Sequence, residues 1–405
     1  MQPQRVVITG VGVISALGPS RDVFWQALSA GRSGIGPLTA VDSEQLRFKY
    51  AAEALDFQPE QHFEPQQLSL TDRFAQFALV AAREAVADAR IEWTPELRER
   101  TAVVSGACVG GQAANEQGSI DVYRDNRRAH PLTVVRTMMN AGASHVSMEF
   151  GLTGPTFTLS TACASSTHAI GHAYWLVRHG LADLALAGGS EAPFVLMHLK
   201  AWESMRVVAK DTCRPFSRQR SGMILGEGGA MLTLEPLDAA LERDAPIYAE
   251  IVGFGMSADA QHITQPASAG AARAIRAALQ DGGLEPQQIG YINAHGTGTQ
   301  ANDSSETAAI RTVFGDHAGR LAVSSTKSMH GHALGAAGAI EAAATALALR
   351  HGVLPPTANF IDPDPECDLD VIPNAARAAE PEYALSNSFA FGGLNAVLAF
   401  RRWAG

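Results

Sequence analysis

Cys163 lies in the segment Thr158-Leu159-Ser160-Thr161-Ala162-Cys163-Ala164-Ser165-Ser166, between two runs of different periodicity. Pro155 to Thr161 is typical of a buried strand, and Ser166 to His179 has the apolar spacing of a helix. A cysteine at such a turn faces the free N–H groups of the helix, and the positive end of the helix dipole favours the thiolate. We therefore expect a nucleophile near neutral pH. A free cysteine is also commonly a small buried apolar residue, so the cysteine alone does not show whether its role is catalytic or structural.

Two histidines are placed where they can converge with this cysteine. His295 follows the strand-like run Ile289 to Ala294 and precedes Gly296-Thr297-Gly298-Thr299. His332 lies in Lys327-Ser328-Met329-His330-Gly331-His332-Ala333, just before an alanine-rich helical run. Strand ends and helix starts carry the side chains that share a cavity in layered α/β proteins. One cysteine and two histidines in such positions predict an enzyme.

Composition restricts the class of protein. The 405 residues carry a net charge of −10, which disfavours nucleic acid as a partner because phosphate binding needs a basic surface. The four cysteines show no CxxC pair and no histidines at metal-ligand spacing, so we expect a reducing compartment and no metal site. Val6 to Thr9 is typical of a first strand rather than of a signal peptide, and no run of about 18 apolar residues occurs. These features predict a cytoplasmic protein without membrane insertion.

Strand-like and helical runs alternate along the chain, which predicts an α/β fold with helices on both faces of parallel or mixed sheets. A charged stretch bounded by prolines, Pro236 to Pro246, separates two parts in which strand, helix and strand recur in similar order. We therefore expect two structurally duplicated halves, residues 1–240 with the cysteine and residues 241–405 with the two histidines. The run Gly10-Val11-Gly12-Val13-Ile14-Ser15 lacks the third glycine of a dinucleotide fingerprint, so we expect no NAD.

Five ordered segments resemble the β-ketoacyl-acyl-carrier-protein synthases, in particular the elongating, synthase II-like branch. They are Ala162-Cys163-Ala164-Ser165, Ala294-His295-Gly296-Thr297, Ser325-Thr326-Lys327-Ser328, Gly331-His332-Ala333-Leu334-Gly335-Ala336-Ala337-Gly338 and Asn387-Ser388-Phe389-Ala390-Phe391-Gly392-Gly393. The resemblance covers essentially the whole chain. It implies a thiolase-like fold, with two βαβαβαββ halves in a five-layer αβαβα arrangement, and an acyltransferase that forms a homodimer or a heterodimer.

The resemblance also implies a reaction. Cys163 takes an acyl group from a carrier protein, malonyl-acyl-carrier protein loses CO2, and the resulting enolate attacks the acyl thioester to give 3-oxoacyl-acyl-carrier protein. His295 and His332 donate Nε2–H to the thioester oxygen where the enolate charge develops. Lys327 supports the histidines, and Glu306 and Glu341 are the buried acids that pair within this network. No cofactor is implied, because the phosphopantetheine arrives on the carrier protein.

Further roles follow from the same resemblance. The N–H groups of Cys163 and Phe389 form the oxyanion hole, and Phe389, with Phe391 in the same loop, gates access to the cysteine. Val109 lines the acyl pocket and leaves more room than the isoleucine common in this branch, so we expect tolerance of longer or bulkier acyl chains. The cations expected to contact the acidic carrier protein are Arg124, Arg127, Arg128, Arg206 and Lys210.

Several positions depart from the usual pattern of this branch. Glu64 to Leu68 is poor in lysine, Ser221 stands where an aspartate often precedes the glycine, Ala390 replaces a glycine, and Leu394 replaces a threonine. These departures make a specialised pathway (polyketide, polyene or nodulation-type lipid) an alternative to housekeeping fatty-acid synthesis. The competing function is a noncatalytic or decarboxylase-only subunit resembling a chain-length factor, although such a subunit normally lacks the cysteine. A coenzyme A thiolase would carry a second cysteine in the last motif, where this chain has Asn387-Ser388-Phe389, and a synthase III-like enzyme would pair the cysteine with a histidine and an asparagine rather than with His332. A cysteine hydrolase is a further alternative, and a pocket with two histidines fits condensation better.

Overall fold

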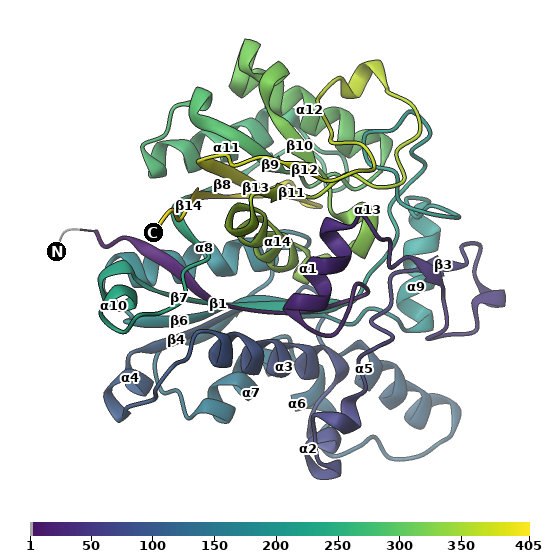
Figure 1. Cartoon of the computed structure of the whole chain (residues 1–405). Coiled ribbons are helices and arrows are strands. Elements are labelled where there is room, and N and C mark those ends of the chain that lie inside the picture. The colour runs from purple at the N-terminus through teal and green to yellow at the C-terminus, as the bar shows by residue number, and fades with distance from the viewer. Residues whose placement is uncertain (1–2) are drawn as a thin grey trace.

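Strands and helices alternate as the sequence predicts, and the computed structural model describes them over residues 3–405 (Figure 1). The strands are β1 (Val6–Ser15), β2 (Gly36–Pro37), β3 (Tyr50–Ala51), β4 (Thr101–Gly106), β5 (Thr156–Leu159), β6 (Leu184–Glu191), β7 (Gly228–Pro236), β8 (Ala249–Ala258), β9 (Ile289–Asn293), β10 (Ala322–Ser324), β11 (Val353–Leu354), β12 (Arg377–Ala378), β13 (Tyr383–Ala390) and β14 (Leu394–Arg402). The α-helices are α1 (Arg21–Ser29), α2 (Pro65–Leu70), α3 (Arg73–Asp88), α4 (Pro95–Glu99), α5 (Gln112–Ser119), α6 (Thr133–Thr137), α7 (Ala141–Phe150), α8 (Ser165–Arg178), α9 (Leu196–Met205), α10 (Leu237–Glu242), α11 (Ser268–Gly282), α12 (Gln300–Phe314), α13 (Lys327–His330) and α14 (Ala337–His351). Within residues 3–405, none of the helices is long and apolar enough to cross a bilayer.

Ten of the strands form one sheet, and this sheet consists of two similar parts. Its order is β10-β9-β13-β14-β8-β1-β7-β6-β4-β5, and the parts meet where β1 pairs antiparallel with β8. In the first part, β4 runs parallel to β5 and β6, and β7 runs antiparallel to β6 and β1. In the second part, β9 runs parallel to β10 and β13, and β14 runs antiparallel to β13 and β8. The repeated order and direction is the structural duplication that the sequence predicts. The predicted boundary at residue 240 lies within α10, which links the two parts.

Helices cover the outer faces of both sheet parts and also fill the space between them (Figure 1). α3 and α7 pack on one part, α11 and α12 lie on the outer side of the other, and α8 and α14 lie between the two, which gives five layers. The alanine-rich α14 is buried on all sides from Ala337 to Leu349, as expected for a helix enclosed by other elements. Gly338 lies where α14 approaches α8, because a Cβ there would come within 1.9 Å of Thr167 Oγ1.

β5, which leads to Cys163, is at the end of the sheet rather than in its interior. The expectation of a buried strand over Pro155 to Thr161 is therefore wrong in one respect: the strand exists, but its side chains are half-buried or exposed. β-Branched and aromatic residues are enriched in central and edge strands alike, so local composition does not distinguish the two. The edge position places the turn after β5 beside the first residues of α8.

Candidate active site

Cys163 lies on a strained turn between β5 and α8. Ala162 has a φ of 49°, in the left-handed region that residues with a Cβ seldom adopt. Two hydrogen bonds of Ser165 hold the turn, because Thr161 N donates to Ser165 Oγ (2.9 Å) and Ser165 Oγ donates to Ala162 O (2.6 Å). Helix α8 begins at Ser165 itself. The turn directs the Cys163 thiol into a cavity, and the strained backbone conformation is that of the preceding residue, Ala162.

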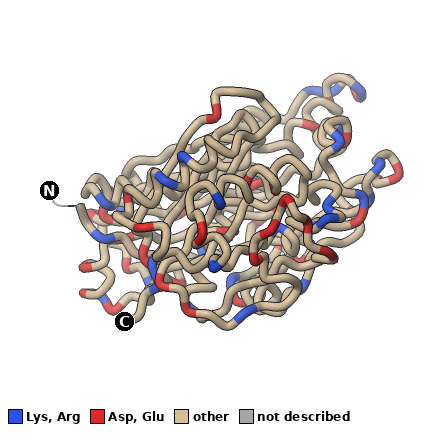
Figure 2. The backbone as a smooth tube through the Cα atoms, turned by 90° about the horizontal axis from the view of Figure 1, so that it is seen from above, with Lys and Arg blue, Asp and Glu red and all other residues tan. Residues whose placement is uncertain are grey.

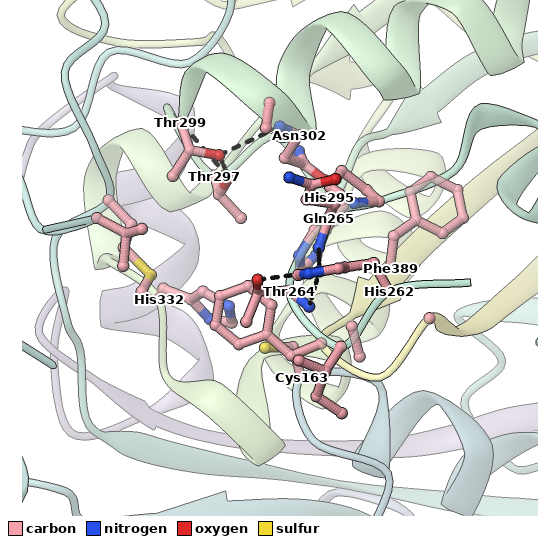
Figure 3. A pocket seen from close by; sticks show the side chains of 18 of the residues that line it. Cys163, His262, Thr264, Gln265, His295, Thr297, Thr299, Asn302, His332 and Phe389 are labelled. Carbon is pink, nitrogen blue, oxygen red and sulfur yellow. Dashed lines mark hydrogen bonds between the residues drawn. The ribbon is translucent and has the colours of Figure 1, made fainter. Parts of the chain in front are cut away.

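The cavity has a volume of about 110 Å³, and its wall comes from distant parts of the chain (Figure 3). Cys163, His295 and His332 each contribute one atom, the thiol Sγ or a ring nitrogen, and these three atoms lie within 4.8 Å of one another. All three side chains are buried. The structure thus brings together the three residues that the sequence singles out.

Hydrogen bonds to Nδ1 assign the tautomer of both histidines. Nδ1 of His295 lies 3.3 Å from the Lys327 ammonium, and Nδ1 of His332 accepts from the N–H of Leu334 at 3.1 Å. When Nδ1 is the acceptor, the proton of a neutral imidazole is on Nε2. Burial and the charge of Lys327 lower the pKa of both rings well below the ordinary value, so both are neutral at pH 7. The site therefore has two Nε2–H donors and no imidazolium.

Lys327 is fully buried beneath these histidines. Its ammonium donates to the carbonyl oxygen of His295 (2.7 Å) and forms an ion pair with Glu341 of α14. Glu306 is a buried acid of this network, as expected, and its carboxylate accepts from the N–H groups of His295 (2.9 Å) and Gly296 (2.8 Å). Glu341 thus balances the buried charge, and Glu306 holds the backbone of the histidine loop.

The acidity of Cys163 is the opposite of what the helix dipole suggests. Burial raises the pKa of the thiol to about 11, although Lys327 and the N–H groups of Phe391 and Cys163 lower it. The expectation of a resting thiolate near neutral pH is therefore wrong for the substrate-free site. The cysteine is a thiol at rest, and its proton leaves in the course of the reaction.

The two phenylalanines of the last motif occupy different places. Phe389 is in β13, is 7% exposed, and packs its ring against His295 at a centroid distance of 6.2 Å. Phe391 lies in the turn after β13, where its N–H faces the Cys163 thiol and its ring stacks on Trp202 at 6.0 Å. The second N–H beside the thiol thus belongs to Phe391, which corrects the assignment of the oxyanion donor to Phe389.

Comparison with known proteins agrees with this geometry. The models for the β-ketoacyl synthase N-terminal domain and C-terminal domain match residues 3–240 and 248–361. The chain belongs to the β-ketoacyl synthase family. It is therefore an acyltransferase, a condensing enzyme with a thiolase-like fold.

Three relatives show the range of this family of ketoacyl synthases. Nodulation protein E of Rhizobium sp. (strain N33) is 48% identical over 404 residues, which cover 98% of this chain and 99% of the relative. The 3-oxoacyl-[acyl-carrier-protein] synthase 2 of Staphylococcus aureus (strain COL) is 41% identical over 410 residues, 99% of each chain. The solved structure of the ishigamide ketosynthase/chain length factor superposes with a TM-score of 0.94 at 38% identity, covering 99% of this chain and 100% of that one.

Two predicted features of this ketoacyl synthase differ from the structure or stay untested. Among residues 3–405, Val109 is not part of the cavity wall, and its N–H donates to Glu191 at 3.2 Å, so its role in an acyl pocket stays a prediction. Ala390 has a negative φ, and the positive φ values of the turn belong to Gly392 (83°) and Gly393 (68°). Replacement of glycine by Ala390 thus causes no backbone strain.

The predicted docking cations of the synthase lie in two places. Arg124 and Arg127 both pair with Asp125, so a neighbouring acid already offsets their charge, and Arg128 is exposed beside them. Arg206 and Lys210 line an open groove of about 540 Å³. The second place is therefore the better candidate for an acidic partner.

The groove also contains Arg47 and two acids, Glu203 and Asp211. Glu203 accepts from the backbone N–H of Arg47 and also pairs with Lys200, and Asp211 pairs with Arg214, so each acid of the groove has a further cation beside it. Arg47, Arg206 and Lys210 therefore give the groove a positive character.

The sequence does not indicate two other parts of the cavity wall. One is the loop of residues 262–266, which is joined to the turn after β13 because the N–H of Gly392 donates to Ile263 O (2.7 Å). The other is Trp202 of α9. No pattern marks the loop, whereas the spacing of Trp202 from His198, four residues earlier on one helix, could have drawn attention to that helix face.

Proposed function

We propose that this ketoacyl synthase joins an acyl group held on Cys163 to the two-carbon unit of malonyl-acyl-carrier protein. The products are 3-oxoacyl-acyl-carrier protein, CO2 and free carrier protein. The observation that carries the proposal is the meeting of one thiol and two neutral histidines, with reactive atoms within 4.8 Å of one another, in one cavity. A single thiol would suffice for acyl transfer or hydrolysis, whereas two Nε2–H donors provide for an enolate.

The first step transfers the acyl group to the enzyme. Sγ of Cys163 attacks the carbonyl carbon of the incoming thioester, the bond to the pantetheine sulfur breaks, and the cysteine proton passes to that leaving sulfur. The N–H groups of Cys163 and Phe391 lie beside the thiol, which supports their role as the donors to the oxyanion. The pantetheine arm belongs to the carrier protein, so the proposal requires no resident cofactor.

The second step forms the carbon–carbon bond. Loss of CO2 from the malonyl group leaves an enolate, and its carbon attacks the acyl carbonyl and releases the Cys163 sulfur as a thiolate, which takes up a proton from solvent to restore the resting thiol. His295 and His332 donate Nε2–H to the enolate oxygen. Because the pKa of both rings is lowered, both are neutral at pH 7 and do not have to lose a proton before they act. Lys327 acts through His295, because its contact with Nδ1 keeps the ring proton on the side of the cavity.

The noncatalytic alternative is not favoured. A subunit that only supports a partner has no need of a nucleophile on a strained turn or of two histidines held in one tautomer. Here Cys163, His295 and His332 are all present, and the buried Lys327–Glu341 pair that supports them is complete. Keeping a buried ion pair costs desolvation energy, which is expected where it serves the reaction.

The carrier protein is proposed to dock at the groove of Arg47, Arg206 and Lys210. Figure 2 shows acidic and basic residues interspersed over a chain whose net charge is −10, so a groove in which three cations outnumber two acids is a local exception. The S. aureus relative is named for an acyl-carrier protein. Residues of one segment, 202–210, line both this groove and the catalytic cavity, so a carrier bound here is within reach of the cysteine.

A second subunit is proposed to cover the edge strand β5. The segment between β4 and β5 carries exposed apolar side chains, among them Tyr123 (88% exposed), Val134 (74%) and Met148 (66%), and α7, which carries Met148, contacts β5. Exposed apolar side chains that gather on one surface mark interaction sites. A second copy is the simplest occupant, and a related partner subunit is the alternative. Light scattering of the purified chain distinguishes these two occupants. A dimer would support a second copy, and a stable monomer would mean that a different subunit covers β5. The free cysteines suit the reducing cytoplasm.

The experiment that tests the function uses intact-mass spectrometry. The protein is incubated with acyl-carrier proteins that carry chains of different length, and the mass gain on Cys163 is located by peptide mapping. Malonyl-carrier protein is then added, and we expect loss of the adduct together with a 3-oxoacyl carrier product. The range of chains accepted tests the specialised-pathway alternative, which the greater identity to nodulation protein E supports. Failure of every thioester to load Cys163 would refute the proposal.

A further inference from the structure

A tryptophan and a histidine on α9 lie against the turn that closes the cavity. The indole of Trp202 lines the cavity and stacks on the ring of Phe391, with 6.0 Å between centroids and 22° between planes. Nε1 of Trp202 donates to Nε2 of His198 at 2.8 Å. Neither residue has a role in the chemistry described above.

The hydrogen bond fixes the orientation of the indole. An indole N–H can only donate, so Nε2 of His198 is an unprotonated acceptor and the imidazole is neutral. The two residues are one helical turn apart on α9, both are half-buried, and their rings meet edge to face at 6.1 Å and 78°. A partly buried indole N–H without a partner is unfavourable, which holds the indole in the rotamer that faces Phe391.

Phe391 has two functions in this arrangement. Its N–H faces the Cys163 thiol, and its ring is part of the cavity wall, so a movement of that ring changes the opening through which the thiol is reached. The ring can move only by leaving Trp202, and the glycines that follow allow the turn to do so, because Gly392 and Gly393 already have positive φ.

We infer that Trp202, oriented by His198, holds Phe391 in the closed position and so sets how readily Cys163 is reached. Both are positioning residues that act through Phe391. The inference rests on the proposed acylation of Cys163 for its biological meaning, but it can be measured without any condensation. Access to the thiol is read directly from its alkylation by a bulky reagent, N-phenylmaleimide, and by a small one, iodoacetamide.

An aromatic pair contributes about 0.5–1.5 kcal/mol beyond buried area, which converts to a factor of about 2 to 10 in an equilibrium. Trp202→Ala should therefore raise the rate of Cys163 alkylation by N-phenylmaleimide about two- to tenfold, and the rate with iodoacetamide by less. Trp202→Phe keeps a ring against Phe391 and should restore a rate near that of the wild type. His198→Ala should give an intermediate increase, and His198→Gln, which retains an acceptor, should reverse it.

Cys213 and Cys367 are internal controls in the same protein. Both are buried and neither lines the cavity, although the Cys213 thiol donates to Thr297 O behind its wall, and peptide mapping reports their alkylation in every sample. An unchanged Cys163 rate in Trp202→Ala would overturn the inference, and so would an equal rise at Cys213 and Cys367, since that indicates a loosened fold. An equal rise in Trp202→Phe would show that stacking is not what holds the turn. A protein that shows the expected alkylation pattern but never accepts an acyl group would contradict the proposed function and leave this inference intact.

Discussion

The alkylation rate of Cys163 in the substrate-free enzyme should rise about tenfold per pH unit from pH 7 to nearly pH 10, with no plateau at neutral pH. The thiolate is the reactive form, and burial raises the pKa of this thiol to about 11. The thiolate fraction is then about one in ten thousand at pH 7 and about one in a hundred at pH 9. A cysteine ionised by the helix dipole would instead react at a constant rate above neutral pH.

Magnitudes decide between the two effects. Moving the thiol pKa from its ordinary 9.0 to about 11 corresponds to about 3 kcal/mol against the thiolate. A helix N-terminus stabilises a nearby anion by about 0.3–1 kcal/mol, and by up to about 2 kcal/mol in favourable, partly buried geometries. Desolvation therefore outweighs the dipole. Lys327 lowers the pKa of Cys163, so Lys327→Met should slow alkylation further at any fixed pH below the thiol pKa.

The assay is a pH series with iodoacetamide, quenched at short times and read by peptide mapping. The thermal transition is recorded at each pH, and only the range over which it stays constant is used, so that a rise in rate does not report unfolding. A plateau in the Cys163 rate by pH 8 would refute the reasoning. It would mean that the helix N-terminus and Lys327 together overcome the cost of burying the charge.

Three further predictions concern the supporting residues. Replacing either catalytic histidine by alanine should lower condensation about 10²- to 10³-fold while acyl loading on Cys163 persists in intact-mass spectra; loss of loading would argue for a different role. Lys327→Met and Glu341→Gln should each lower the free energy of unfolding by about 3–5 kcal/mol in urea titrations, and the double variant should lose less than the sum, so additive losses would contradict the pairing. Arg206→Glu should raise KM for acyl-carrier protein but not for a small thioester analogue, whereas Arg377→Glu, outside the groove, should change neither.

The chemistry of the site is predictable from the sequence because it depends on chain positions that recur in layered α/β proteins. Cys163 at a strand-to-helix turn, His295 after a strand and His332 before a helix are each local patterns, and the topology of the sheet brings such ends together. The duplicated order of strands is predictable for the same reason. Neither requires knowledge of side-chain packing.

What the sequence does not reveal depends on burial and register. Strand β5 has the composition of a central strand, and only the assembled sheet shows that it is an edge. Phe389 and Phe391 are two residues apart, and the pairing of Phe389 with Asn395 places one in the strand and the other in the turn. The acidity of Cys163 depends on its desolvation, which is a property of the folded cavity.

The duplication also explains why the cysteine and a histidine meet. Cys163 precedes α8, which follows β5 and leads to β6, and His332 precedes α14, which follows β10 and leads toward β13. Because β5 and β6 correspond to β10 and β13, and because α8 and α14 pack against each other between the sheets, the two residues occupy equivalent ends of the two central helices. The positive ends of both helix dipoles are therefore directed toward one cavity. That field is too weak to ionise a buried thiol at rest, but it acts on the negative charge that develops on the bound thioester and enolate oxygens, where the hydrogen bonds of the Nε2–H donors add to it.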